Sequence, residues 1–181
     1  LAYSAREKIV FFLHTHFTAI QSKIDNSRAL YYQNLLFRQF ALDDTAGPNV
    51  NFKELTKKIS IDNAMLILLD GRQNVKGSVN ENYARELLEL YTIGRGLEAA
   101  PPATSGEGDY GVFTELDVQA AAKVLSGWDI DNTFLNLDPD TNLPRGVVKG
   151  GINSASSHDN EVKRFSSRFG ETEIKPNPLL T

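Results

Sequence analysis

The sequence predicts a mainly α fold: a multi-helix orthogonal bundle followed by an irregular C-terminal segment that can contain short strands. Two observations lead to this prediction. Apolar residues recur at helical spacing over most of the chain up to Gly127, and several of these stretches are preceded by a residue that can cap a helix, among them Ser4, Asp62 and Thr114. After Asp129 the helical period disappears. We therefore expect a helical core over residues 4–128 and an irregular extension over residues 129–181.

The first helix is expected to begin at Ser4, which can form a capping box with Glu7. Phe11 and Phe12 lie off the apolar stripe of this helix, so we expect it to be buried on more than one side. Little sheet is expected outside residues 129–165. The expected helices cover residues 4–24, 28–41, 52–60, 62–70, 79–93 and 114–127.

Two segments between the expected helices have the composition of loops. LDDTAGPN at 42–49 combines Asp, Gly and Pro, and residues 95–112 are rich in Gly, Pro, Ala and Ser, which is typical of a flexible surface loop.

A third segment, DPDTN at 138–142, begins like a calcium-binding loop. Leu143 stands where such a loop needs Gly, and Lys149 where it needs Glu, so we expect no EF-hand here.

Length and composition limit the classes of function. The chain has 181 residues, of which 41% are hydrophobic and 23% charged, and this suits one globular domain. Its net charge of −4 argues against a nucleic-acid-binding protein, which would need clustered Lys and Arg. No apolar run approaches the ~18 residues of a membrane span. Cysteine is absent, which excludes thiol catalysis and disulfides. Because the chain opens without Met, in a helical pattern, we expect it to be part of a longer parent protein.

The stretch NENYARELLELYTIG, residues 80–94, carries the densest pattern in the chain. Glu81–Arg85 and Arg85–Glu89 are pairs four residues apart, and each such pair stabilises an exposed helix by about 0.2–0.5 kcal/mol. We expect Arg85 to be partly buried and paired with one of these two carboxylates. One apolar arc is expected to face the core: Tyr83, Ala84, Leu87, Leu88, Leu90 and Tyr91.

The polar face of this helix has two interpretations. It is an ordinary solvated face, or it turns inward, where three carboxylates around Arg85 could hold a metal or share a proton. His14 and His16 are the natural further ligands, but they stand two residues apart on one helix and cannot both face one ligand there. The His158-Asp159 pair in the irregular segment is a weak additional candidate.

Several motifs occur in an order that resembles a known family. They are FFLHTHF at 11–17, AMLILLDG at 64–71, NENYARELLELYTIG at 80–94, FTELDVQAAAKVLSGW at 113–128, and His158-Asp159 followed by Lys163. Together they resemble the large bacterial family called domain of unknown function 1800, over residues 5–163. The sequence departs from the family pattern where the family has Trp, Pro, Arg and Thr, namely at Leu13, Asn63, Lys123 and Ser126. It also lacks the Gly that follows His-Asp in the family.

The resemblance implies a mainly helical, exported bacterial protein, located in the periplasm, at the cell surface or outside the cell, with no established reaction. The family pattern includes polar positions of the helix as well as apolar ones, namely Asn80, Glu81, Arg85 and Glu86. It therefore favours a polar face that is buried as a structural network or that forms a site.

Three functions are open at this point. The first is a structural or interaction domain of an exported protein, with a protein partner. The second is a metal-assisted hydrolase that uses a divalent ion. Its metal ligands would come from His14, His16, His158 and Asp159, and its catalytic residues would be Glu81, Arg85 and Glu86. The third is a carbohydrate- or polymer-binding module that stacks its ligand on aromatic rings, namely Trp128, Tyr110 and Tyr91.

Overall fold

The computed structural model describes residues 4–41 and 50–180, so the loop expected at 42–49 lies outside the described residues. The chain divides into two compact units. The first unit comprises Leu1–Leu68 and Asp129–Val147, and the second comprises Leu69–Trp128 and Val148–Thr181. Each unit thus combines helices with part of the segment that follows residue 128. Whether residues 4–128 fold as a domain of their own stays a prediction.

The mainly α class is confirmed, because the described residues form seven α-helices and only four strands of two residues each. The first unit contains α1 (Ala5–His16), α2 (Gln21–Ile24), α3 (Ser27–Phe40), α4 (Phe52–Ile59) and α5 (Asn63–Leu68). The second contains η2 (Gly71–Gln73), α6 (Glu81–Glu86), η3 (Leu87–Thr92), α7 (Glu115–Val124) and η4 (Ser167–Phe169). No helix among the described residues is long and apolar enough to cross a membrane.

The helix expected over residues 4–24 is in fact two helices. Ser4 caps α1 as predicted, with its hydroxyl accepting a hydrogen bond from the Glu7 N–H at 3.3 Å. The helix ends at His16, because the backbone of Phe17 leaves the helical region. The hydroxyls of Thr15 and Thr18 donate to the backbone carbonyls three residues earlier, at 2.8 and 3.0 Å. Such bonds compete with the helical ladder and explain a break that the apolar period did not predict.

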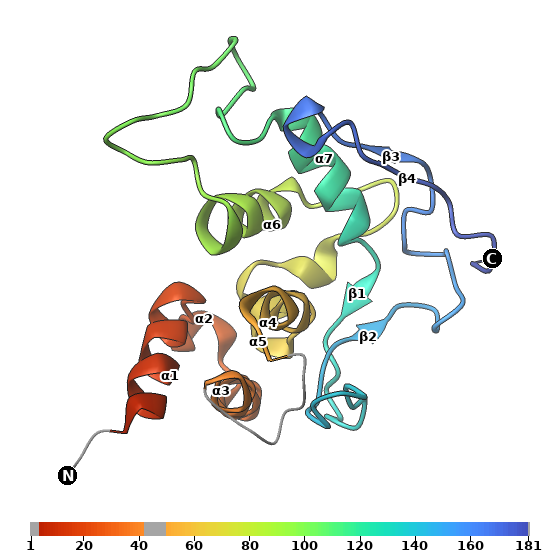
Figure 1. Ribbon diagram of the computed structural model, residues 1–181. Coiled ribbons are helices and arrows are strands. Elements are labelled where there is room, and N and C mark those ends of the chain that lie inside the picture. The colour runs from red at the N-terminus through yellow and green to blue at the C-terminus, as the bar shows by residue number, and fades with distance from the viewer. Residues whose placement is uncertain (1–3, 42–49, 181) are drawn as a thin grey trace. The chain divides into compact units, whose positions relative to one another are not determined.

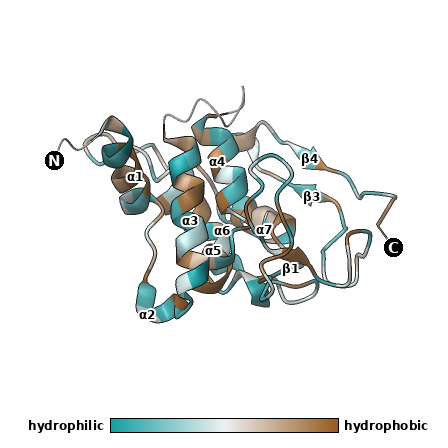
Figure 2. Ribbon diagram, turned by 90° about the horizontal axis from the view of Figure 1, so that it is seen from below, coloured by the Kyte–Doolittle hydropathy of each residue, from teal (hydrophilic) through white to brown (hydrophobic). Residues whose placement is uncertain are grey.

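The core of the first unit lies between α1, α3, α4 and α5, since α3 packs against each of the other three. Phe17, Phe37 and Ile59 are completely buried in it. Figure 2 shows hydrophobic and hydrophilic residues interleaved along α3, as a helix with one buried side requires. Phe11 and Phe12 are 70% and 58% exposed, so the expectation that α1 is buried on more than one side is wrong for this chain.

In the second unit α6 packs against α7, and α7 packs against strand β3 (Lys163–Arg164). Figure 1 shows α6 and α7 side by side, joined by the long loop that projects away from both. The expected helix over residues 79–93 is present, but it changes from α to π geometry at Leu87. A π turn rotates each residue less than an α turn does. Leu88 and Tyr91 therefore keep their predicted burial, whereas Leu90 is 56% exposed.

The long loop is held by ion pairs and by its own packing. Arg95 pairs with Glu89 at 2.8 Å, and Arg168 pairs with Asp109 at 3.0 Å. Hydrogen bonds from the Gly111 and Ser105 backbone N–H groups, in that order of effect, lower the pKa of Asp109. A Cβ on Gly96 or Gly111 would meet the ring of Pro102 at 2.6 or 2.8 Å, so both ends of the loop pack closely against its middle.

The strands are short, as predicted for the C-terminal segment. Strand β1 (Trp128–Asp129) pairs with β2 (Val147–Val148). Strand β3 pairs antiparallel with β4 (Glu173–Ile174), with Lys163 opposite Ile174. Strand β4 lies beyond residue 165, where little sheet was expected.

Candidate functional site

Asn80 begins α6 and connects it to the rest of the second unit. Its side-chain oxygen accepts a hydrogen bond from the Tyr83 N–H at 3.2 Å, which caps the helix. Its side-chain nitrogen donates to the carbonyls of Leu69 and Asp70 at 3.2 and 3.0 Å. Its backbone N–H donates to the side chain of Asn74, which is fully buried. All these bonds are internal, so Asn80 has a structural role.

Asn74 extends this network to α7. Its side-chain nitrogen donates to the Ala122 carbonyl at 2.8 Å, and its backbone carbonyl accepts from the Gly127 N–H at 2.8 Å. The two asparagines thus tie the start of α6 to the C-terminal part of α7 without using any charge.

Arg85 is the centre of the polar face of α6. Its guanidinium group binds both oxygens of Glu115, at 3.0 and 2.6 Å, and also donates to the Tyr110 hydroxyl at 2.9 Å. Tyr110 in turn donates to Glu115 at 2.8 Å. The side chains of Arg85 and Glu115 are 26% and 32% exposed. Arg85 is therefore partly buried and paired with a carboxylate, as expected.

The identity of the partner differs from the expectation. Neither Glu81 nor Glu89 forms the ion pair, because α7 packs on α6 and presents Glu115 in a planar, two-bonded geometry. Such a pair is stronger than a pair between side chains four residues apart on one helix. Glu89 pairs with Arg95 instead.

The electrostatics of this cluster follow from the ion pair. The hydrogen bond from Arg85 lowers the pKa of Glu115, and the hydrogen bond from the Tyr110 hydroxyl assists it. Glu81 interacts with the same carboxyl group. The same pairing raises the pKa of Arg85, so both groups stay charged. We call Glu81, Arg85, Tyr110 and Glu115 the Arg85 cluster. It brings together two of the three predicted catalytic residues.

Glu86, the third predicted catalytic residue, interacts with Tyr91 rather than with Arg85. It stands five residues before Tyr91, and the π turn places residues at this spacing on the same side of the helix. Burial, and then the charge of Glu86, raises the pKa of Tyr91. The hydroxyl of Tyr91 thus stays protonated beside the carboxylate.

Asp117, in the first turn of α7, is completely buried. Its carboxylate accepts hydrogen bonds from the N–H and hydroxyl of Thr114, at 2.7 and 2.8 Å. It also accepts from the N–H and hydroxyl of Ser166, both at 2.7 Å. Four donors around one carboxylate offset the cost of burying it. They also fasten the C-terminal segment to the start of α7.

His158 and Asp159 are held at the other end of α7 by Ser126. The Nδ1 atom of His158 lies 2.9 Å from the Ser126 carbonyl, and since a carbonyl can only accept, Nδ1 carries the proton. The Ser126 hydroxyl accepts a hydrogen bond from the Asp159 N–H at 2.8 Å.

Two further residues fit closely around this pair. Gly127 has a φ of 87°, and a Cβ there would lie 2.8 Å from the His158 backbone nitrogen. Lys163 is 3% exposed and donates to the Asp159 carbonyl, and its burial lowers its pKa.

The two histidines of α1 lie in the first unit and have different surroundings. The Nε2 atom of His14 accepts from the Asn34 side chain at 2.8 Å, and its ring meets the edge of Phe37 at 4.7 Å. Burial, and then the charge of Arg38, lowers the pKa of His14. The ring of His16 packs at 5.2 Å from Phe52.

Within the described ranges, no three His, Cys, Asp or Glu side chains gather in a way that could hold a metal. The predicted ligands His14 and His16 belong to the first unit, and His158 and Asp159 to the second. Their convergence on Glu81 and Glu86 therefore stays a prediction.

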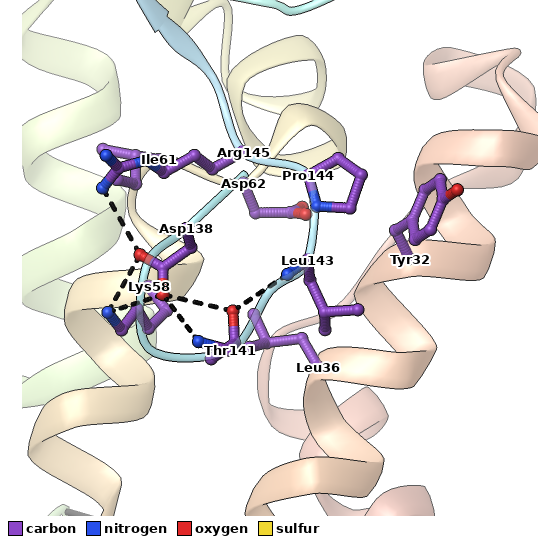
Figure 3. Close-up of a pocket in the computed structure, with 10 residues that line it drawn as sticks. All are labelled: Tyr32, Leu36, Lys58, Ile61, Asp62, Asp138, Thr141, Leu143, Pro144 and Arg145. Carbon is purple, nitrogen blue, oxygen red and sulfur yellow. Dashed lines mark hydrogen bonds and ion pairs between the residues drawn. The ribbon is translucent and has the colours of Figure 1, made fainter. Parts of the chain in front are cut away.

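The first unit has a pocket of its own, drawn in Figure 3, with a volume of about 10 Å³, which is room for one water molecule. Asp138 occupies one side and pairs with Lys58 at 2.8 Å and Arg145 at 3.3 Å. The DPDTN segment is thus a turn whose first carboxylate binds cationic side chains of this unit.

Asp62 lines the same pocket and is 3% exposed. Its carboxylate accepts from the Met65 N–H and from the Gln33 side chain, each at 3.1 Å. Burial raises its pKa to about 7. The sequence predicted Asp62 as a helix cap but not its burial. A helix cap has the same residue pattern whether it lies at the surface or in the core.

Comparison with known proteins gives one result. No curated protein and no solved structure matches the chain. The sequence model of the family described as protein of unknown function (DUF1800) matches residues 2–175 of the 181 in the chain. The chain therefore belongs to this family of proteins of unknown function.

Proposed function

We propose that this chain is a structural or interaction domain of an exported bacterial protein, with its helices in an orthogonal bundle and its signature polar residues organising the fold. The observation that carries the proposal is Asp117, whose four hydrogen-bond donors all come from Thr114 and Ser166. A general acid or base must be able to reach a substrate. A completely buried carboxylate with its lone pairs used internally instead supports a structural role.

The other signature residues support the same role. Asn80 bonds to the backbone of its own unit, and Ser126 positions His158 and Asp159. Arg85 uses its guanidinium group on Tyr110 and Glu115, which both stand where the long loop leads into α7. These side chains hold segments that are distant in sequence.

The proposal is tested by comparing stability with function in the parent protein. Asp117→Asn replaces an acceptor oxygen by an NH₂ group that faces N–H and hydroxyl donors, and should cost about 2–4 kcal/mol. Ile59→Ala, in the completely buried core of the first unit, is a matched control and should cost about 2–5 kcal/mol. The abundance of the parent protein in cells, and the phenotype that depends on it, should fall in proportion to stability for both variants.

A folded, abundant Asp117→Asn protein with no function would contradict the structural role and indicate chemistry at this carboxylate. Export is tested separately by cell fractionation of the parent protein, which should be found outside the cytoplasm. Recovery in the cytoplasmic fraction would refute this part of the proposal.

A metal-assisted hydrolase is the alternative that the Arg85 cluster keeps open, because Arg85 and Tyr110 are only partly buried beside two carboxylates. Metal analysis of the purified parent protein decides between the two. A structural domain should contain well below one divalent ion per chain, and a stoichiometric ion would favour the hydrolase.

Two of the three aromatic residues named for a polymer-binding module, Tyr91 and Tyr110, do not favour that function. Tyr91 is 6% exposed, so its ring cannot receive a sugar. The ring of Tyr110 lies 5.5 Å from the guanidinium carbon of Arg85 and 4.9 Å from that of Arg95. Both arginines occupy the neighbourhood that a stacked ligand would need.

A further inference from the structure

The second unit has a polar hollow between the turn after Leu69 and the first turn of α6, with a volume of about 400 Å³. This volume falls within the range of small-molecule sites. The hollow is lined by Asp70, Gln73, Ser78, Val79, Asn80 and Asn82. It is separate from the Arg85 cluster, with which it shares no residue.

The walls of the hollow are fixed by internal bonds. Asn80 is held through Leu69, Asp70 and Tyr83, and its backbone is anchored on the buried Asn74. Ser78 exchanges backbone hydrogen bonds with Val75, at 2.9 and 3.3 Å. A ligand would therefore meet groups that are already positioned, which lowers the entropic cost of binding.

Several polar groups of the hollow are not used by the protein itself. Among the described residues, neither the Asn82 amide nor the Ser78 hydroxyl makes a side-chain hydrogen bond within the chain, and both residues are exposed. Among the same residues, the Gln73 side chain makes only a long hydrogen bond of 3.4 Å, from its nitrogen to the Asp70 carboxylate. The hollow thus offers amide donors, amide acceptors and a hydroxyl beside one carboxylate.

We propose that this hollow binds a neutral, polyhydroxylated ligand, such as a segment of an oligosaccharide. A sugar hydroxyl both donates and accepts, and the amide, hydroxyl and carboxylate groups of the hollow match both functions. None of the described residues that line it is cationic, which disfavours an anion. Asp70 is the single carboxylate, too few for a divalent cation, and Val79 is the single apolar side chain, too few for a lipid or aromatic ligand.

The proposal is tested by NMR titration of the complete, ¹⁵N-labelled chain with maltohexaose, cellohexaose and chitohexaose. An open, shallow site without a stacking ring should bind weakly, with a Kd on the order of 1 mM. With at least one of the three probes, the side-chain NH₂ signals of Asn82 and Gln73 and the backbone signals of residues 78–82 should shift and saturate.

Two variants locate the binding. Asn82→Ala removes an exposed side chain with no internal bond, so the melting curve should not change, while Kd should rise about five- to tenfold. Asn153→Ala removes an exposed asparagine outside the hollow and should leave Kd unchanged.

Glycerol at an equal concentration of hydroxyl groups controls for a general effect of the solvent. Three results would each overturn the proposal: no saturating shifts with any of the three oligosaccharides, equal shifts in Asn82→Ala, or equal shifts with glycerol. The structural role proposed above is measured by stability in the Asp117→Asn variant, so either proposal can fail without the other.

Discussion

Asp62 gives the first unit a stability that should depend on pH. Its folded pKa is about 7, because burial disfavours the charged form more than the Gln33 and Met65 donors favour it, whereas its ordinary value is 3.8. Between these two values the folded protein binds a proton at Asp62 that the unfolded chain has released. The contribution of Asp62 is therefore fully present below pH 3.8, decreases as the pH rises, and is lost above about 7.

The size of the effect follows from the difference between the two pKa values. One pKa unit corresponds to about 1.36 kcal/mol, so the full change is on the order of 4 kcal/mol. Asp62→Asn keeps an oxygen that can accept from Met65 and Gln33 but cannot ionise. Relative to the unmodified protein, this variant should gain stability steadily between pH 4 and about pH 7, and the difference should then stay constant.

The assay is urea unfolding at several pH values, with hydrogen exchange of the Met65 amide as a local report on α5. Taking the difference between variant and unmodified protein removes the effect of other carboxylates such as Glu115, whose pKa is shifted the opposite way. Ser22→Ala, at an exposed residue of the same unit that carries no titratable group, is the control and should show a constant difference. If the Asp62→Asn difference were also constant to within about 1 kcal/mol, the buried carboxyl would not titrate as argued.

Two further predictions concern the second unit. Arg85→Ala should cost about 1–3 kcal/mol in urea unfolding, since it leaves Glu115 and Tyr110 half-buried without their cation; a loss below about 0.5 kcal/mol would mean that solvent replaces the pair. Gly127→Ala should cost about 1–3 kcal/mol, because its φ of 87° strains any side chain and the new Cβ would meet the His158 backbone. An unchanged melting temperature in this variant would show that the contact at His158 is not close in solution.

Local signals in the sequence were sufficient for most helix starts. Ser4 and Thr114 cap their helices through the side-chain bonds that their spacing predicts, and Thr114 completes a capping box with Asp117. A cap depends on residues three positions apart, so it can be recognised without knowing the fold. The break after His16 and the π turn at Leu87 could not be recognised in this way, because apolar spacing does not distinguish them from a continuous α-helix.

The candidate site shows the same limit more strongly. The sequence correctly marked Arg85 as a partly buried ion-pair residue, but its partner Glu115 lies 30 positions away in sequence. The pair forms only because α7 packs on α6. The spacing of residues within one helix does not show which other helix packs on it. Asp62 is a similar case, since the difference between a surface cap and a buried carboxyl depends on which helices cover it.

The division of the chain has a consequence for how the protein is made. Neither unit is a continuous stretch of sequence: the first is completed by Asp129–Val147, and the second by Val148–Thr181. On a ribosome, the first unit cannot close until residue 147 has emerged, by which time most of the second has already been synthesised. In the first unit, Gly146 must reach Leu66 and Ile61, which precede it by about 80 residues, and such long-range contacts form slowly. Neither unit of a nascent chain should therefore reach its complete packing until late in translation.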